Sequence, residues 1–169
     1  MSEPVAIDRT QFREAMARLG AAVNIVTTAG PEGDAGITVS AVCSVTDDPA
    51  TVLVCINRAS RLHDTFRSAG VLCVNILAHE QEELSPIFAG KDHLPMAERF
   101  SRARWTRLAT GAPALENAAA SLDCKIDQTV EVGTHTVFFC TVQAIHLGTS
   151  SSGIVYHGRA YHHIQSQKK

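Results

Sequence analysis

The sequence predicts a mainly β protein, in which antiparallel strands form a barrel with flanking helices. Stretches rich in apolar and β-branched residues recur along most of the chain, and only short helical segments separate them. The glycine-rich stretch Gly30-x-x-Gly33-x-x-Gly36 lies in a hairpin loop, and no helix follows it. Because a doubly wound parallel sheet needs repeated strand–helix units and a glycine-rich first turn, these observations favour a closed antiparallel barrel.

Length and composition indicate one domain. The 169 residues are 45% hydrophobic and 19% charged, which allows a substantial core. We expect a single domain over residues 1–169, with flexible tails at 1–6 and 165–169. A net charge of −2 argues against a protein that coats nucleic acid or an anionic membrane. The polar N-terminus and the strand-length apolar runs predict neither a signal peptide nor a membrane helix.

The cysteine pattern predicts a reducing compartment. The chain has five cysteines, an odd number, and no Cys-x-x-Cys pair occurs. Four of the five lie in apolar, β-branched stretches, which is typical of small buried core residues rather than of a disulfide framework. We therefore predict a cytoplasmic protein. The cysteines are Cys43, Cys55, Cys73, Cys124 and Cys140.

The first third of the chain predicts a helix, a hairpin and a third strand. Asp8 is a good N-cap, and apolar residues recur at helical spacing from there to Gly20. Strands over 22–28 and 37–45 flank a Gly/Pro loop, which predicts an antiparallel hairpin. A third strand is expected over 51–56.

The rest of the chain predicts two more helices among further strands. Ser60 is a plausible N-cap for a helix through Phe66 that Gly70 ends. Residues 71–77 are almost continuously apolar, so both faces of this strand should be covered. The other expected elements are a helix over 79–89, an irregular stretch over 90–113 with a helical piece near 96–100, strands over 121–130, 136–147 and 154–156, and the polar tail.

The segment 36–46 is the most informative part of the sequence. Thr38, Ser40 and Ser44 share one parity, so a regular strand would present a hydroxyl-lined face. The polar edge of a flavin ring needs such a face, ideally with backbone amides beside it. An edge strand with a solvated Ser/Thr face would have the same pattern, and the spacing alone does not separate the two interpretations.

The segment 57–61 is suited to a phosphate group. Asn57, Arg58, Ser60 and Arg61 follow a buried-type strand and open a predicted helix, so a hydroxyl, two guanidinium groups and free amides would meet there. Ordinary helix capping with solvated arginines explains the same residues, and taken alone the segment favours that interpretation.

Several histidines lie near turns. His135 follows Gly133 and Thr134 between two strands, where an imidazole could position a nicotinamide or lie at the surface. The histidines within 156–163 lack a Cys or carboxylate at ligand spacing, so we predict no metal site there. A strand at a cleft or subunit interface explains this segment better. Motifs for hydrolases and for phosphate-binding loops are absent from the sequence.

Taken together, these segments resemble the short-chain flavin reductase family, whose fold is the FMN-binding split barrel. The likeness runs in order from about Ile7 to His163. Each motif alone is weak, and their joint occurrence is specific. The matching segments are 12–16 (FREAM), 20–28 (GAAVNIVTT), 36–46 (GITVSAVCSVT), 53–57 (LVCIN), 72–77 (LCVNIL) and 133–135 (GTH).

Within this family the chain is most similar to the reductase components of two-component flavin monooxygenases. These include the partner of 4-hydroxyphenylacetate 3-monooxygenase and the flavin reductase of pyrimidine-ring degradation. The second is the more similar, through segments 123–126 and 132–135. The resemblance implies a homodimer that passes reduced flavin to a monooxygenase. A corrin reductase with the same fold stays open as an alternative function.

The resemblance also implies which residues bind the cofactor. The flavin ring and ribityl chain would lie against Thr38, Val39, Ser40, Ala41, Ser44 and Thr46, and the phosphate end against Asn57, Ser60 and Arg58. The family's Gly-Asp-His motif, which is linked to nicotinamide binding, falls on residues 133–135. Thr134 stands where that motif has aspartate, so His135 is the candidate for nicotinamide positioning and a carboxylate role is in doubt.

We therefore expect an enzyme in which NADH or NADPH passes a hydride from nicotinamide C4 to N5 of FMN or FAD. The flavin supplies the reactivity, so no catalytic triad is needed. Flavin binding should be weak, because the reduced product must leave. Two alternatives stay open: a non-catalytic flavin-binding protein, and a structural barrel whose hydroxyl face is solvated.

Overall fold

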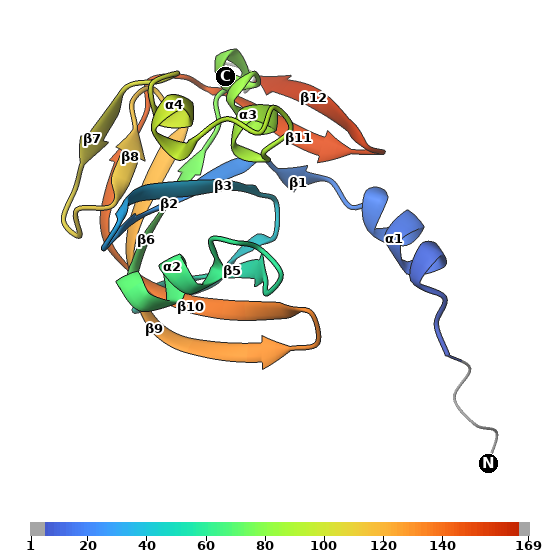
Figure 1. Cartoon of the computed structure of the whole chain (residues 1–169). Coiled ribbons are helices and arrows are strands. Elements are labelled where there is room, and N and C mark those ends of the chain that lie inside the picture. The colour runs from blue at the N-terminus through green and yellow to red at the C-terminus, as the bar shows by residue number, and fades with distance from the viewer. Residues whose placement is uncertain (1–5, 166–169) are drawn as a thin grey trace.

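A seven-stranded antiparallel sheet dominates the structure. The computed structural model describes residues 6–165. The strand order is β3-β2-β6-β9-β10-β5-β4, and every neighbouring pair is antiparallel. Figure 1 shows how the sheet curls. Its strands are β2 (Asn24–Gly30), β3 (Gly33–Val39), β4 (Val42–Asp47), β5 (Ala50–Asn57), β6 (Val71–Ile76), β9 (Ala120–Val132) and β10 (His135–Leu147).

The two edges of the curled sheet are consecutive in the chain. β3 ends at Val39 and β4 begins at Val42, so Ser40 and Ala41 carry the chain from one edge strand to the other. In the described residues no ladder joins β3 to β4, and the barrel is split rather than closed. The predicted mainly β, antiparallel architecture is confirmed, whereas the closed barrel is wrong.

The single strand predicted over 37–45 is also wrong. A tight turn interrupts it, in which the amide of Val42 donates to the carbonyl of Ser40 at 2.9 Å. The first half then pairs with β2, as the predicted hairpin requires, and the second half pairs with β5. This break decides which of the predicted hydroxyl groups can share one surface.

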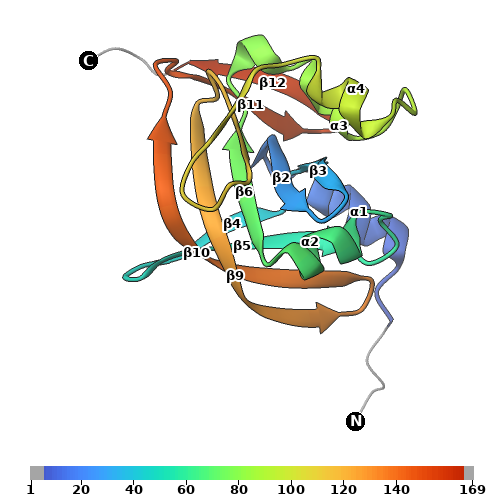
Figure 2. The same ribbon diagram turned by 60° about the vertical axis from the view of Figure 1, so that its left-hand side comes forward.

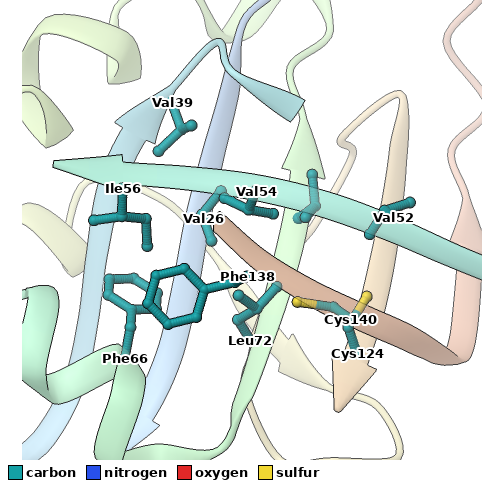
Figure 3. Close-up of a cluster of buried hydrophobic side chains, with 11 residues drawn as sticks. Val26, Val39, Val52, Val54, Ile56, Phe66, Leu72, Cys124, Phe138 and Cys140 are labelled. Atoms are coloured by element: carbon teal, nitrogen blue, oxygen red, sulfur yellow. The ribbon is translucent and has the colours of Figure 1, made fainter. Parts of the chain in front are cut away.

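The main core lies inside the curl of the sheet (Figure 3). Helix α2 (His63–Ala69) adds Phe66 to this core, and Gly70 ends the helix in the left-handed conformation with φ 70°. The predicted covering of both faces of β6 is confirmed, because Leu72 and Val74 enter this core while Cys73 packs in a separate cluster. The buried members of this main cluster are Val26, Val39, Val52, Val54, Ile56, Phe66, Leu72, Val74, Cys124, Phe138 and Cys140.

A second cluster fills the space between the curled sheet and a layer of short elements above it. Ile25 from β2 and Phe88 from α3 are among its buried members. Figures 1 and 2 show these elements gathered at one end of the barrel. They are β1 (Ala21–Ala22), β11 (Ser152–His157) and β12 (Ala160–Gln165) in one small sheet, the hairpin β7 (Trp105–Arg107) and β8 (Pro113–Leu115), and the helices η1 (His79–Gln81), α3 (Leu84–Phe88) and α4 (Met96–Phe100).

Some expected elements differ in this upper layer. The helix predicted over 79–89 is split, because Pro86 in a continuous helix would clash with the carbonyl of Glu82. The stretch 90–113 contains the expected helical piece and also β7, whose pairing with β8 was not predicted. Gln165, expected in a tail, ends β12 and pairs with Ser152. The rest of the expected tails, apart from Ala6, lies outside the described residues.

The predicted N-terminal helix is present as α1 (Arg9–Ala17). The carboxylate of Asp8 accepts hydrogen bonds from the amides of Thr10 and Gln11, which confirms it as the N-cap. None of the residues of α1 is buried, and Figure 1 shows the helix standing out from the body. Within residues 6–165, no helix is both long enough and apolar enough to cross a membrane.

The cysteines follow the expected pattern in part. Cys73, Cys124 and Cys140 are buried, Cys55 is half-buried and Cys43 is exposed. All five are free thiols. The prediction of core cysteines is therefore confirmed for three of them.

Candidate active site

A cavity of about 630 Å³ opens at the point where β3 passes into β4. Its volume lies in the range usual for small-molecule sites. Three segments that are far apart in sequence form one side of it, and the α3–α4 region forms the other. It is lined by Ile37, Thr38, Val39, Ser40, Ala41, Cys55, Ile56, Asn57, Ser60, Arg61, Leu62, Phe88, Ala89, Gly90, Met96, Arg99 and His135.

The end of β3 provides polar backbone at the cavity wall. Ser40 and Ala41 lie outside both strands, and in the described chain their amide N–H groups donate to no protein acceptor. Two such donors suit the acceptor atoms along the polar edge of a flavin ring. The hydroxyl of Thr38 is already engaged, because it donates to the carbonyl of Ser85 at 2.6 Å.

The predicted hydroxyl-lined face is not continuous. Ser44 and Thr46 lie on β4, are exposed and do not line the cavity, whereas Thr38 and Ser40 do. The turn at Ser40 places the two halves of the segment on opposite edges of the sheet, and the register shifts again between Ser44 and Thr46. Alternation along one strand therefore does not describe this wall.

The loop between β5 and α2 forms the next part of the cavity. The side-chain oxygen of Asn57 accepts from the amide of Ala59 at 2.9 Å, and the carbonyl of Asn57 accepts from the amide of Ser60 at 3.0 Å. These bonds hold a tight turn, so α2 begins only at His63. The predicted N-cap role of Ser60 is therefore wrong, since Leu62 occupies that position.

Ser60 and Arg61 nevertheless both face the cavity. The hydroxyl oxygen of Ser60 accepts from the amide of Leu62 at 3.3 Å, which leaves the hydroxyl hydrogen available to donate. A hydroxyl donor beside a guanidinium group is a suitable pair for a phosphate oxygen.

Arg58 lies beside the cavity rather than in its lining. Its guanidinium contacts Glu131 at 3.3 Å and donates to the carbonyl of Gly133 at 3.2 Å. The amide of Arg58 also donates to the carbonyl of Thr134 at 2.9 Å. Arg58 thus joins the β5–α2 loop to the β9–β10 turn.

The predicted turn at 133–135 is confirmed and brings His135 to the mouth of the cavity. Gly133 has a φ of 55°, a conformation that favours glycine, and His135 is the first residue of β10. The imidazole Nδ1 lies 2.9 Å from the hydroxyl of Thr134, and the ring is exposed. In strand register His135 faces Asn57, so two predicted site residues lie side by side.

Sequence reasoning missed the far wall of the cavity. Phe88 to Gly90 end α3, and Met96 and Arg99 come from α4. The guanidinium Nε of Arg99 donates to the carbonyl of Leu94 at 2.9 Å, which fixes this cation at the cavity. Phe88 and Ala89 fall in the helix predicted over 79–89, but no pattern marks them as cavity residues, and Met96 and Arg99 lie in a short helix within the irregular stretch.

The cavity favours anions. Arg61 and Arg99 line it, and within residues 6–165 no carboxylate belongs to its lining. Burial raises the pKa of the Cys55 thiol, so this wall residue is neutral at physiological pH. A phosphate, or a ring that becomes anionic on reduction, is the kind of ligand that such an environment stabilises.

Comparison with known proteins identifies the family of this chain. Residues 16–165, almost the whole chain, match the family described as "Flavin reductase like domain". The chain belongs to this family. The resemblance noted from the motifs is therefore confirmed, and with it the split-barrel fold.

Several relatives in the family are similar over most of their length. The protein named FMN reductase (NADH) RutF of Variovorax paradoxus is 52% identical over 95% of this chain and 88% of its own. The protein of the same name from Serratia proteamaculans is 53% identical over 95% of this chain and 91% of its own.

Solved structures in the family share the fold. A candidate flavin reductase from Haemophilus somnus has a TM-score of 0.90 at 47% identity, covering 94% of this chain and 100% of its own. The NADH:FAD oxidoreductase SgcE6 of Streptomyces globisporus has a TM-score of 0.87 at 27% identity, covering 99% of this chain and 100% of its own. The styrene monooxygenase flavin reductase of Pseudomonas putida S12 has a TM-score of 0.80 at 26% identity, covering 94% and 99%.

Proposed function

We propose that the chain is an NADH-dependent flavin reductase that uses FMN and supplies reduced flavin to a partner monooxygenase. The observation that carries the proposal is the cavity, which unites the end of β3, the β5–α2 loop and the turn at His135. Relatives about half identical to this chain bear the name FMN reductase (NADH), which supports FMN and NADH over FAD and NADPH.

The residues of the cavity fit an isoalloxazine nucleotide. The free amides of Ser40 and Ala41 would donate to the polar edge of the ring, and Ser60, Arg61 and Arg99 would bind the phosphate. Bound FMN would supply the redox chemistry, by accepting at N5 a hydride from C4 of the nicotinamide. The contribution of the protein is then orientation and charge stabilisation, and no general acid or base is required.

His135 is proposed to position the nicotinamide. Its exposed ring lies at the cavity mouth and is held by Thr134, so it can meet a second ligand without displacing a core contact. Thr134, which stands where the family motif has aspartate, would orient the imidazole through a hydroxyl instead of a carboxylate. Ser44, Thr46 and Arg58 lie outside the cavity lining. Their contribution to flavin binding stays a prediction.

The proposal includes a homodimer and a cytoplasmic location. Exposed apolar side chains support the dimer: Val130 and Val132 on β9, and Ile145 and Leu147 on β10, range from 38% to 73% exposed. The register places the valines at the turn of the β9–β10 hairpin and the other two at its far end, so a partner copy that ran along the whole hairpin would bury both groups. Five free thiols support a reducing compartment.

One anaerobic assay tests the proposed function. Purified protein is mixed with FMN and NADH, and bleaching of the visible flavin band is followed. Rapid bleaching with NADH, and slower bleaching with NADPH, is expected. Quenching of FMN fluorescence without bleaching would instead identify a flavin-binding protein, and the absence of both would identify a structural barrel.

A further inference from the structure

A second hollow adjoins the mouth of the main cavity. It has a volume of about 560 Å³ and lies between α1 and the β9–β10 turn. His135 lines both this hollow and the main cavity, so the two meet at that residue. Figures 1 and 2 both show α1 on the same side of the molecule as the tip of the β9–β10 hairpin. We call it the α1 groove; its lining is Ile7, Arg9, Phe12, Arg13, Thr134 and His135.

The α1 groove has the chemistry of a nucleotide site. Arg9 and Arg13 are one helical turn apart and line the groove together, and none of the described residues that line it is a carboxylate. Phe12 also lines it and is 56% exposed, which leaves an aromatic face available to a planar ring. The nearby carboxylate of Glu131 is already paired with Arg58 and Arg67.

The other charged residues at α1 lie outside the α1 groove. Asp8, Glu14 and Arg18 line a different hollow on this helix, and Glu14 pairs with Arg159 at 2.9 Å. The cationic face of α1 therefore turns toward His135, while its acidic residues turn away.

Size and charge together indicate what the α1 groove accepts. A main cavity of about 630 Å³ suits one ligand of the size of FMN, so the far half of a nicotinamide dinucleotide must lie outside it. Another hollow adjoins the main cavity beside Tyr156 and Tyr161; its volume is about 160 Å³, and none of the described residues that line it is charged. A pyrophosphate carries two negative charges, which favours the groove with two arginines.

We infer that the α1 groove binds the pyrophosphate and adenosine half of NADH, with Arg9 and Arg13 on the phosphates and Phe12 against the purine. This inference rests on the proposed function, because it takes the nicotinamide to lie at His135. It assigns to α1, a helix that contributes nothing to the core, the task of holding the donor nucleotide.

The test compares Arg9→Gln/Arg13→Gln with Arg18→Gln, which removes one positive charge at the C-cap of the same helix, outside the groove. Because none of these residues is buried, both proteins should fold, which circular dichroism verifies. Two quantities are measured: the affinity for ADP-ribose, which has the pyrophosphate and adenosine but no nicotinamide, and the anaerobic kinetics with NADH and with reduced nicotinamide mononucleotide.

The double variant should bind ADP-ribose about tenfold more weakly and raise KM for NADH by a similar factor. Its kcat, its FMN affinity and its KM for the mononucleotide should stay near the wild-type values, and Arg18→Gln should match the wild type throughout. Unchanged ADP-ribose affinity in the double variant, no ADP-ribose binding by the wild type, or an equal loss in Arg18→Gln would overturn the inference. A wild type that binds ADP-ribose through these arginines but does not reduce FMN would leave the groove assignment standing and refute the proposed function.

Discussion

The imidazole Nε2 of His63 lies 2.8 Å from the hydroxyl oxygen of Thr136, and both residues are buried. The other ring nitrogen contacts the carboxylate of Asp64 at 2.9 Å. His63 begins α2, directly after the loop that carries Ser60, and Thr136 follows His135. This buried pair therefore fixes the proposed phosphate loop against the proposed nicotinamide turn.

Thr136→Val should weaken this connection without changing the volume of the side chain much. The His63 nitrogen would lose its buried partner, which costs about 1–3 kcal/mol of unfolding free energy. Urea unfolding measures the loss, and Thr129→Val, at an exposed position on the neighbouring strand, is the control. Equal stability of the two variants would show that the pair does not hold the loop.

Ser60→Ala tests the phosphate loop itself. If the hydroxyl donates to the FMN phosphate, its removal should weaken FMN binding by about 1–2 kcal/mol, measured by quenching of flavin fluorescence. Ser68→Ala removes an exposed hydroxyl from α2 and should leave the affinity unchanged. Wild-type affinity in Ser60→Ala would remove this residue from the site.

The sequence predicted those parts of the site that depend on local patterns. The glycine at 133 and the strands on either side placed His135 at a turn, and the polar residues after a buried strand placed Asn57 and Ser60 beside one another. The break at Ser40 could not be predicted in this way, because hydroxyl and apolar residues continue to alternate across it. It follows from pairing with two different strands, which is a property of the whole sheet.

The contribution of Arg99 and the α3–α4 wall to the cavity could not be predicted from the sequence for a related reason. Their position depends on how residues 90–113 fold over the barrel, and that stretch contains few periodic positions. The packing that places it there is tertiary: Phe88, Phe100 and Trp105 contact one another with ring centroids between 4.8 and 5.7 Å apart. This cluster joins residues from three elements, so it cannot be predicted from the spacing of residues within any one of them.

Asn75 should be essential for stability. Its side-chain amide donates to the carbonyl of Ile25 at 3.0 Å, and its oxygen accepts from the amide of Leu115 at 2.7 Å and from the hydroxyl of Ser121 at 2.9 Å. Asn75→Ala would leave several buried groups unpaired and should lower the unfolding free energy by about 2–4 kcal/mol. Thermal and urea unfolding measure the loss. Gln143→Ala, which removes an exposed side-chain amide from β10, should cost much less.

The buried thiols should make the protein less stable in alkali. Burial, assisted by Asp123, raises the pKa of Cys124 from its ordinary value of 9.0 to about 12, and burial also raises the pKa of Cys73 and Cys140. At a pH between the ordinary thiol pKa and the raised pKa of the folded protein, each thiol is deprotonated in the unfolded chain and still protonated in the folded chain. The unfolding free energy therefore falls as pH rises, by up to about 1.4 kcal/mol per pH unit for each thiol.

Cys124→Ala removes one of these titrating groups, so its unfolding free energy should fall less steeply than that of the wild type above pH 9.0. Val52→Ala is the control, since it truncates the same core without removing a titrating group and should lower stability at every pH with an unchanged slope. Parallel curves for Cys124→Ala and the wild type would contradict the assignment.

His135→Ala should slow reduction by NADH more than it weakens FMN binding. The exposed imidazole at the cavity mouth contacts Thr134 and supports no core side chain, so its loss should leave the fold and most of the flavin contacts in place. Stopped-flow reduction and FMN titration measure the two effects separately. His157→Ala removes an exposed histidine from the β11–β12 hairpin and should change neither. If His135→Ala loses FMN affinity and reduction rate by the same factor, the imidazole belongs to the flavin pocket and not to the nicotinamide, because a group that touches only the donor cannot alter the binding of flavin alone.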